Sequence, residues 1–287
     1  MFKTILVPGL NAVSTPKAMG MALTVARLFD GHIEQLHVHP DAAEMARYTT
    51  SLDVESGVFA GEIWEALERA DKARTALSRE DFSHFTSREK IASVGAVTAA
   101  WHEVSGNELE ETIHQAFYND LVVFSRPEAP TTLSTIGVGD VLVGCGRPLL
   151  LAPTKTCDNP ITTVVIAWKD SATSARAVTA AMPLLAKADK IVVLGAVEDG
   201  ADPQSVIDST ERLAAHLRYH GLKPQAGHIK VEKRDACEAI LDSAMNKLHA
   251  GLLVMGGYGH SRARELMFGG FTRHVMREAP LPVFLCH

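Results

Sequence analysis

The sequence predicts an α/β protein of two tandem, doubly wound domains, each built on a parallel β-sheet. Short apolar runs rich in β-branched residues alternate with amphipathic stretches, for example residues 191–197 after residues 175–185. Such alternation is typical of βαβ units, and runs that are apolar throughout indicate strands covered on both faces. The same strand pattern also occurs twice along the chain. Because crossovers between parallel strands are right-handed, we expect a ligand crevice at the carboxyl ends of the strands.

An internal repeat divides the chain into two halves. Residues 4–8 correspond to residues 163–167 as opening strands, and residues 121–124 correspond to residues 252–255 as later strands. A length of 287 residues suffices for one large or two ordinary domains, so the repeat decides in favour of two. Each half then closes on a matched strand, at residues 148–151 in the first half and 282–285 in the second.

The boundary between the domains is predicted in a short polar segment bounded by prolines, residues 153–160. We therefore expect a first domain at 1–154 and a second at 160–287. The first half carries about 27 extra residues within 41–94. Apolar positions at helical spacing in residues 62–70 indicate that this insertion holds a longer or additional helix.

Composition excludes several classes of partner. The chain has 28 basic and 34 acidic residues, a formal net charge of −6, and no basic block, which argues against nucleic-acid binding. No apolar run approaches the roughly 18 residues of a membrane span, so no membrane association is expected. The N-terminus enters a strand directly without a signal peptide, and the four cysteines show no C-x-x-C spacing. These features predict a cytoplasmic protein whose cysteines stay outside disulfides.

A glycine-rich segment is the strongest functional signal in the chain. It begins at Gly256 and Gly259, directly after the apolar run at 252–255, and continues after nine further residues at Gly269 and Gly270. Glycines let backbone N–H groups face an anion, and a helix N-terminus adds unpaired donors and partial positive charge. The order of strand, glycine loop and helix start therefore predicts a phosphate-binding site. Glycines after a strand are also common turn formers, so a ligand-free turn is the alternative.

This segment resembles the phosphate motif of the bacterial universal stress proteins, whose ATP-binding members carry G-x2-G-x9-G followed by Ser or Thr. Gly256, Gly259 and Gly269 match the motif, and Gly270 stands where the hydroxyl residue is expected. The resemblance implies Rossmann-like domains of the adenine-nucleotide alpha-hydrolase-like type, repeated in tandem and related by a pseudo-two-fold axis. It extends over three further segments, residues 259–262, 273–276 and 281–285.

The resemblance also implies which residues contact a nucleotide. Thr272, two residues after Gly270, is a hydroxyl that can replace the missing one. ATP-binding relatives carry an Asp at the end of the first strand, where this chain has Lys169 followed by Asp170. Asp170 can reach a ribose hydroxyl, or Asp170 and Ser171 can simply cap the following helix. The nucleotide contacts expected in the second domain are Gly256, Gly259, His260, Arg262, Gly269, Gly270, Phe271, Thr272, Ala167, Asp170 and Val197.

The two halves are expected to differ in function. In the first half, residues 125–128 replace the first glycine pair entirely, so only the second domain retains the phosphate motif. By the same resemblance, the closing strands near Leu149 and Val283 pair with each other and make the chain an intrachain pseudo-dimer. Association of two chains into a homodimer is left open.

The sequence shows no convincing metal or catalytic site. His37 and His39 share one face of a strand and could in principle ligate a metal, but no third ligand is evident nearby. We therefore expect two polar residues at a strand end and no metal. The sequence shows no activated nucleophile, paired acid and base, or Walker motif at convincing spacing. Enzymatic activity is not expected beyond slow ATP hydrolysis, for which His260 is the nearest candidate base.

Three functions are consistent with these observations. The favoured one is a cytoplasmic stress-response protein that binds ATP with Mg²⁺, or a related adenine nucleotide, in the C-terminal domain and changes its protein contacts with occupancy. The second is a nucleotide-free interaction module. It is supported by Gly270, by Leu10 and Lys169 at the ends of the two opening strands, and by the erased motif of the first half. The third, a small-molecule hydrolase, rests only on the versatility of the fold.

Overall fold

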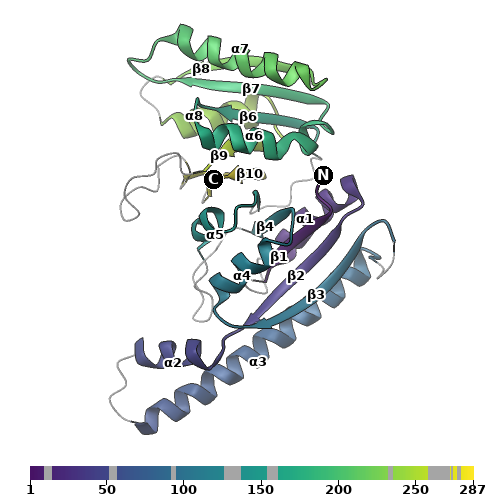
Figure 1. The fold of residues 1–287 in the computed structure, drawn as a ribbon, viewed down its shortest axis with the longest axis vertical. Coiled ribbons are helices and arrows are strands. Elements are labelled where there is room, and N and C mark those ends of the chain that lie inside the picture. The colour runs from purple at the N-terminus through teal and green to yellow at the C-terminus, as the bar shows by residue number, and fades with distance from the viewer. Residues whose placement is uncertain are drawn as a thin grey trace. The chain divides into compact units, whose positions relative to one another are not determined.

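The computed structural model describes residues 1–9, 15–51, 57–91, 95–125, 137–153, 161–231, 235–257, 272, 274–276 and 279–287. The chain forms two compact units, Met1–Arg147 and Pro148–His287. Each unit has helices packed on a mostly parallel sheet, which confirms the predicted tandem α/β fold (Figure 1).

The first unit is built on four parallel strands in the order β3-β2-β1-β4. The central strand β1 pairs with β2 from Thr4↔His32 onward and with β4 at Ile5↔Leu121. Its elements are β1 (Thr4–Pro8), α1 (Thr15–Phe29), β2 (His32–His39), α2 (Ala42–Ser51), α3 (Gly57–Arg88), β3 (Thr98–Ser105), α4 (Glu108–Ala116), β4 (Leu121–Ser125) and α5 (Val138–Gly144).

Helix α1 shows how the sequence directs packing in this unit. Ala18, Ala22 and Ala26 recur every fourth residue and are buried, so they form a stripe of small side chains along one face of the helix. This stripe lets α1 lie close to β1 and β4. The strands that it covers are apolar throughout, as β4 with five buried residues illustrates.

Helices α2 and α3 occupy the stretch of extra residues between β2 and β3. Helix α3 is 32 residues long and includes the helix predicted over residues 62–70. It packs against β2 and β3. A long crossover helix thus covers one face of the outer part of the first sheet.

A ladder of polar pairs joins β2 to α3. Gln35 Nε2 lies 3.3 Å from Ser78 Oγ, His37 Nε2 lies 2.9 Å from Thr75 Oγ1, and His39 Nδ1 lies 2.8 Å from Asp71 Oδ2. The strand residues are two apart and the helix residues are three or four apart. These are the spacings at which each element presents side chains on one face. The register of α3 on β2 is therefore set by matched polar pairs as well as by apolar contact.

The second unit contains six strands in the order β5-β10-β9-β6-β7-β8, parallel except for β5. Helix α6 packs on β9 and β10, and α7 packs on β7 and β8. Its elements are β5 (Leu149–Ala152), β6 (Thr163–Trp168), α6 (Ala172–Leu185), β7 (Lys190–Val197), α7 (Pro203–Tyr219), β8 (Pro224–Lys230), α8 (Ala236–Asp242), a π-helical turn η1 (Ser243–Lys247), β9 (Leu252–Gly256) and β10 (Val283–Cys286).

The two closing strands of the repeat pair with each other, as predicted. Strand β5 runs antiparallel to β10, with Leu149 opposite Leu285 and Leu151 opposite Val283. Because β5 is hydrogen-bonded into this sheet, it is part of the second compact unit although the repeat assigns it to the first half of the chain. The predicted boundary segment, residues 153–160, lies outside the described residues except for Pro153.

The described cysteines are thiols rather than disulfides, as expected. Burial raises the pKa of Cys237 to about 12, and the nearby charges of Asp235 and Glu238 act in the same direction. Burial also raises the pKa of Cys286. Both thiols are therefore protonated near neutral pH and poorly nucleophilic. Among the described residues, no helix is long and apolar enough to cross a membrane.

Close packing at the end of β9 requires a glycine. A Cβ on Gly256 would lie 2.5 Å from the backbone nitrogen of Ser174 and 2.7 Å from the carbonyl carbon of Thr173, both in the first turn of α6. Real side chains do not make contacts this short with backbone atoms. The absence of a side chain at Gly256 therefore allows the N-terminal turn of α6 to rest on the end of β9.

His37 is buried without charge between β2 and α3. Its ring is 0 % exposed, stacks on Trp101 at 5.4 Å and meets the edge of His39 at 4.8 Å. Burial lowers the pKa of His37 to about 4, and the positive charge of Arg74 acts in the same direction. The imidazole is therefore neutral at any pH where the fold is expected to be stable.

Replacing Gly256 by Ala is expected to destabilise the protein by about 1–3 kcal/mol, the usual cost of forcing an atom into a packed site. Urea denaturation would measure this. The matched control is Gly227→Ala in β8, where a Cβ meets nothing closer than 3.8 Å and little change is expected. Equal stability of the two variants would contradict the tight contact between α6 and β9.

Replacing His37 by Gln is expected to flatten the acid dependence of stability. Above pH 6.5 the imidazole is neutral in both states and contributes no pH dependence. As the pH falls from 6.5 to about 4, the unfolded chain binds a proton that the folded chain rejects, so the wild type loses on the order of 3 kcal/mol. Gln keeps a donor toward Thr75 but does not titrate. Urea denaturation in metal-free buffer between pH 7 and pH 4 measures the difference, and parallel curves would refute the neutral burial of His37.

Candidate functional site

The second sheet has a topological switch point between β6 and β9. From β6 the chain moves through α6 to β7 and then through α7 to β8, always toward the same edge. It then returns across the sheet through α8 to β9, on the opposite side of β6. In doubly wound sheets the ligand crevice lies outside the carboxyl ends of the strands at such a reversal. The ends of β6 and β9, where Ala167 pairs with Met255, are therefore the candidate site.

Three of the predicted nucleotide contacts lie at this edge of the sheet. Ala167 is the second-last residue of β6, Val197 ends β7 and Gly256 ends β9. Ala167 and Val197 are buried, and the Val197 carbonyl accepts a hydrogen bond of 2.9 Å from the Val231 N–H. The structure thus gathers these three residues at the carboxyl ends of neighbouring parallel strands.

The start of the glycine segment is fixed to the sheet. Gly257 N–H donates to the carbonyl of Cys286 at 2.8 Å, and His287 Nδ1 lies 3.3 Å from the Gly257 carbonyl. Together with the contact of Gly256 on α6, these bonds hold the first residues of the segment against β10 and α6. Most of the remaining predicted contacts lie outside the described residues, namely Gly259, His260, Arg262, Gly269, Gly270 and Phe271. Thr272 is described and is buried.

The sequence left two roles open for Asp170, and the structure assigns the helix cap to its neighbour. Ser171 is the N-cap of α6, and its hydroxyl accepts a hydrogen bond of 3.2 Å from the Ser174 N–H. Asp170 and Lys169 are exposed at the end of β6. Because the cap is already supplied by Ser171, the Asp170 carboxylate does not serve that purpose.

A hollow of about 440 Å³ opens beside the end of β6, between α6 and α7. Trp168 forms part of its wall, and the indole Nε1–H donates to Ser209 Oγ at 2.9 Å. Sequence reasoning did not single out Trp168, although an aromatic residue at the end of a strand is a recognisable signal. The residues that line the hollow are Trp168, Asp170, Ala175, Val178, Thr179, Ser209, Arg212, Leu213 and His216.

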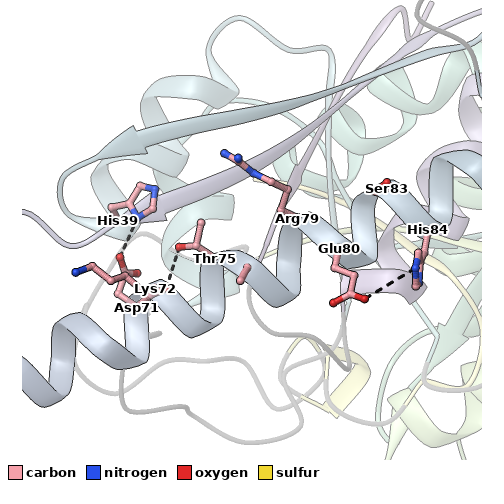
Figure 2. A pocket seen from close by; sticks show the side chains of 9 residues that line it. His39, Asp71, Lys72, Thr75, Arg79, Glu80, Ser83 and His84 are labelled. Carbon is pink, nitrogen blue, oxygen red and sulfur yellow. Dashed lines mark hydrogen bonds and ion pairs between the residues drawn. The ribbon is translucent and has the colours of Figure 1, made fainter.

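A second hollow, of about 780 Å³, lies along α3 in the first unit. Figure 2 shows His39 at the end of β2 facing Asp71, with Thr75, Arg79 and His84 following along the helix. Sequence reasoning found no third ligand near His37 and His39, and the structure supplies one: Asp71 brings His37, His39 and Asp71 together. The signal available in the sequence was the helical insertion itself, because a helix after β2 must cover one face of that strand.

The comparisons with known proteins agree with the fold. The model of the universal stress protein family matches residues 160–287. A universal stress protein from Archaeoglobus fulgidus matches in structure with a TM-score of 0.60 and 17% identity, over 99% of this chain and 95% of that chain. A functionally unknown protein from Pseudomonas aeruginosa matches with a TM-score of 0.54 and 13% identity, over 99% of this chain and 92% of the other. No curated protein sequence matches this chain significantly.

These matches coincide with the parts of the chain that the sequence singled out. The family match spans β6 through β10, which includes the switch point and the glycine segment. The structural match extends over nearly the whole chain, so it includes the first unit as well. Residues 160–287 thus match the universal stress protein family, and the fold of the whole chain is similar to that of a universal stress protein.

Proposed function

We propose that the second unit binds ATP, or a related adenine nucleotide, at the carboxyl ends of β6, β7 and β9. The observation that carries the proposal is the coincidence of two features at one place. The glycine segment starts at Gly256, and Gly256 lies at the topological switch point between β6 and β9. The match of residues 160–287 to the universal stress protein family supports a role in the stress response.

The proposed site divides the nucleotide between two sets of groups. Backbone N–H groups of the segment at Gly256, Gly259 and Gly269 would hold the phosphates, with Arg262 as a charged partner. The nucleoside would lie over the ends of β6 and β7, near Ala167 and Val197. Mg²⁺ would need few protein ligands, because it is held mainly by phosphate oxygens and water.

Asp170 is the described polar side chain best placed to contact the nucleoside. It is exposed, follows β6 by two residues and is relieved of the capping role by Ser171. A carboxylate can accept hydrogen bonds from ribose hydroxyls. Lys169 beside it adds a positive charge that can offset the charge of phosphate.

Nucleotide occupancy would act in the cytoplasm by changing contacts with other proteins. The first turn of α6 rests on Gly256, so a ligand held by the glycine segment lies directly against the end of that helix. A ligand that prefers one arrangement of the segment and α6 shifts the population toward it. Partners that touch this edge of the second unit would then sense the bound nucleotide.

A nucleotide-free interaction module is the second candidate, and one observation favours it. The packing of Thr173 and Ser174 already explains why position 256 is glycine, without any ligand. Gly270 also stands at the position of the phosphate-binding hydroxyl in ATP-binding relatives. On this reading the glycines shape a surface loop that binds a protein partner.

Calorimetric titration with Mg²⁺-ATP distinguishes the two candidates. We expect one site per chain, and we expect Gly259→Val to weaken binding by about 10–100-fold, since it blocks backbone donors whose bonds to a charged phosphate contribute about 1.5–3 kcal/mol each. The control is Gly227→Val, a glycine in β8 away from the proposed site. Absence of binding heat up to millimolar ATP in the wild type would instead favour the interaction module.

A second pair of variants separates the nucleoside contact from the helix cap. Ser171→Ala removes the cap of α6 and is expected to cost about 1 kcal/mol of stability with little direct effect on affinity. Asp170→Asn is expected to lower ATP affinity several-fold while leaving the urea midpoint unchanged. If Asp170→Asn alters stability and not affinity, Asp170 is a structural residue and the nucleoside lies elsewhere.

A further inference from the structure

The side chains of His37, His39 and Asp71 converge at the carboxyl end of β2. His37 and His39 are two residues apart on one strand face, and Asp71 belongs to α3, which packs on that face. One potential ligand atom from each residue lies within 4.8 Å of the others. Around a tetrahedral zinc ion with bonds of 2.0–2.2 Å, ligand atoms are about 3.3 Å apart. The three groups therefore need to close by roughly 1.5 Å at most to surround an ion.

The hydrogen-bond pattern fixes the tautomer of His37 and leaves one nitrogen bare. The Thr75 hydroxyl donates to the Asp71 carbonyl at 2.8 Å, so it accepts from His37 Nε2, which lies 2.9 Å away and must carry the proton. His37 Nδ1 is then an unprotonated lone pair. It is buried and has no hydrogen-bond partner within the described part of the chain. A buried acceptor without a partner destabilises the fold, and a metal bound at that lone pair would remove this cost.

Residues around the cluster orient the three candidate ligands by hydrogen bonds, as the surroundings of known metal sites usually do. Metal-bound histidines donate their other ring N–H to a nearby acceptor, and Thr75 is that acceptor for His37. Ligating carboxylates are held in turn by hydrogen bonds. Arg74 Nη2 lies 3.2 Å from Asp71 Oδ1, which leaves Oδ2 directed at His39. Glu103 accepts from Trp101 Nε1 and pairs with Arg79 through Oε1, and its Oε2 lies 3.8 Å from His39 Nε2.

The cluster borders the hollow along α3. His39 and Asp71 line this hollow (Figure 2). His37 is buried beside them and stacks on Trp101. An ion can therefore reach His39 and Asp71 through the hollow. The hollow also leaves room for water or an anionic ligand at the coordination positions that the protein does not fill.

We propose that the first unit binds one divalent transition-metal ion through His37, His39 and Asp71. Two imidazoles and one carboxylate suit Zn²⁺ and its first-row neighbours, whereas Mg²⁺ and Ca²⁺ prefer oxygen ligands alone. The site is independent of the proposed nucleotide site, because its ligands all belong to β2 and α3. It gives the helical insertion of the first half a chemical role.

Cobalt(II) spectroscopy on the full chain tests this proposal, because Co²⁺ absorbs visible light when protein nitrogen and oxygen atoms ligate it. An exposed pair on α7, His216 and His220, has ring centroids 4.9 Å apart and could chelate the ion weakly. The titrations are therefore made in a background that carries His216→Gln and His220→Gln. We expect one Co²⁺ per chain with visible absorption, and displacement of that signal by one equivalent of Zn²⁺.

Variants of the ligands separate a metal site from a polar network. His37→Gln, His39→Gln and Asp71→Asn are each expected to weaken Co²⁺ binding by at least about 100-fold, and Thr75→Val, which removes the group that orients His37, by about 10–100-fold. His102→Gln is the matched control, since His102 pairs with Glu34 on the same sheet. Circular dichroism checks that each variant is folded. His39→Gln is the variant that keeps the buried ring of His37 in place.

Two results would overturn the proposal. One is a titration of the background protein in which no one-to-one Co²⁺ signal saturates at Co²⁺ concentrations up to about 100 µM. Zinc sites in proteins bind far more tightly than this limit. The other is Co²⁺ binding by folded His39→Gln or Asp71→Asn that equals binding by His102→Gln. In either case the cluster is a hydrogen-bonded contact between β2 and α3 and nothing more.

Discussion

Parallel strand pairing is the constraint on which both candidate sites depend. When all strands of a sheet point the same way, their carboxyl ends gather at one edge, and the residues that follow them meet there. In the second unit this edge holds Ala167, Val197 and Gly256. In the first unit it holds His39, the last residue of β2, after which the chain leaves for α2 and α3. The sheet therefore positions both sites before any functional side chain is considered.

The sequence predicted the strands and the positions of their carboxyl ends well, because each strand is encoded by a local run of apolar residues. The apolar runs at β6 and β9 are continuous and their order follows from the repeat, so Gly256 could be assigned to a strand end. The partnership of Asp71 with His37 and His39 could not be predicted in the same way. It joins residues more than thirty positions apart, and it depends on how far α3 slides along β2, which local patterns do not specify. The polar ladder that fixes this position becomes visible only when both elements are placed.

The first half of the chain shows how an insertion can change what a repeated domain does. The strands and helices of the first half follow an order similar to that of the second half. The sequence after β4, however, lacks the glycine pair, and α3 brings Asp71 and Thr75 over β2. A crossover helix with only apolar side chains on that face would have required apolar partners on the strand. Here His37 and His39 take their place and pair with Thr75 and Asp71, which leaves His37 Nδ1 as a buried acceptor without a partner among the described residues.

Under the proposed function, helix α6 is the element through which a bound nucleotide would influence other proteins. Its first turn is pressed against Gly256, and the helix also packs on β10, the strand that pairs with β5. Such a helix transmits occupancy only if it has two arrangements that the ligand distinguishes, because a ligand with equal affinity for both shifts nothing. The tight contact at Gly256 provides that sensitivity, since a displacement of the glycine segment by a fraction of an ångström changes a contact that has no slack. If the proposed phosphate site binds a nucleotide, the packing that the missing side chain permits would be what couples that site to the helix.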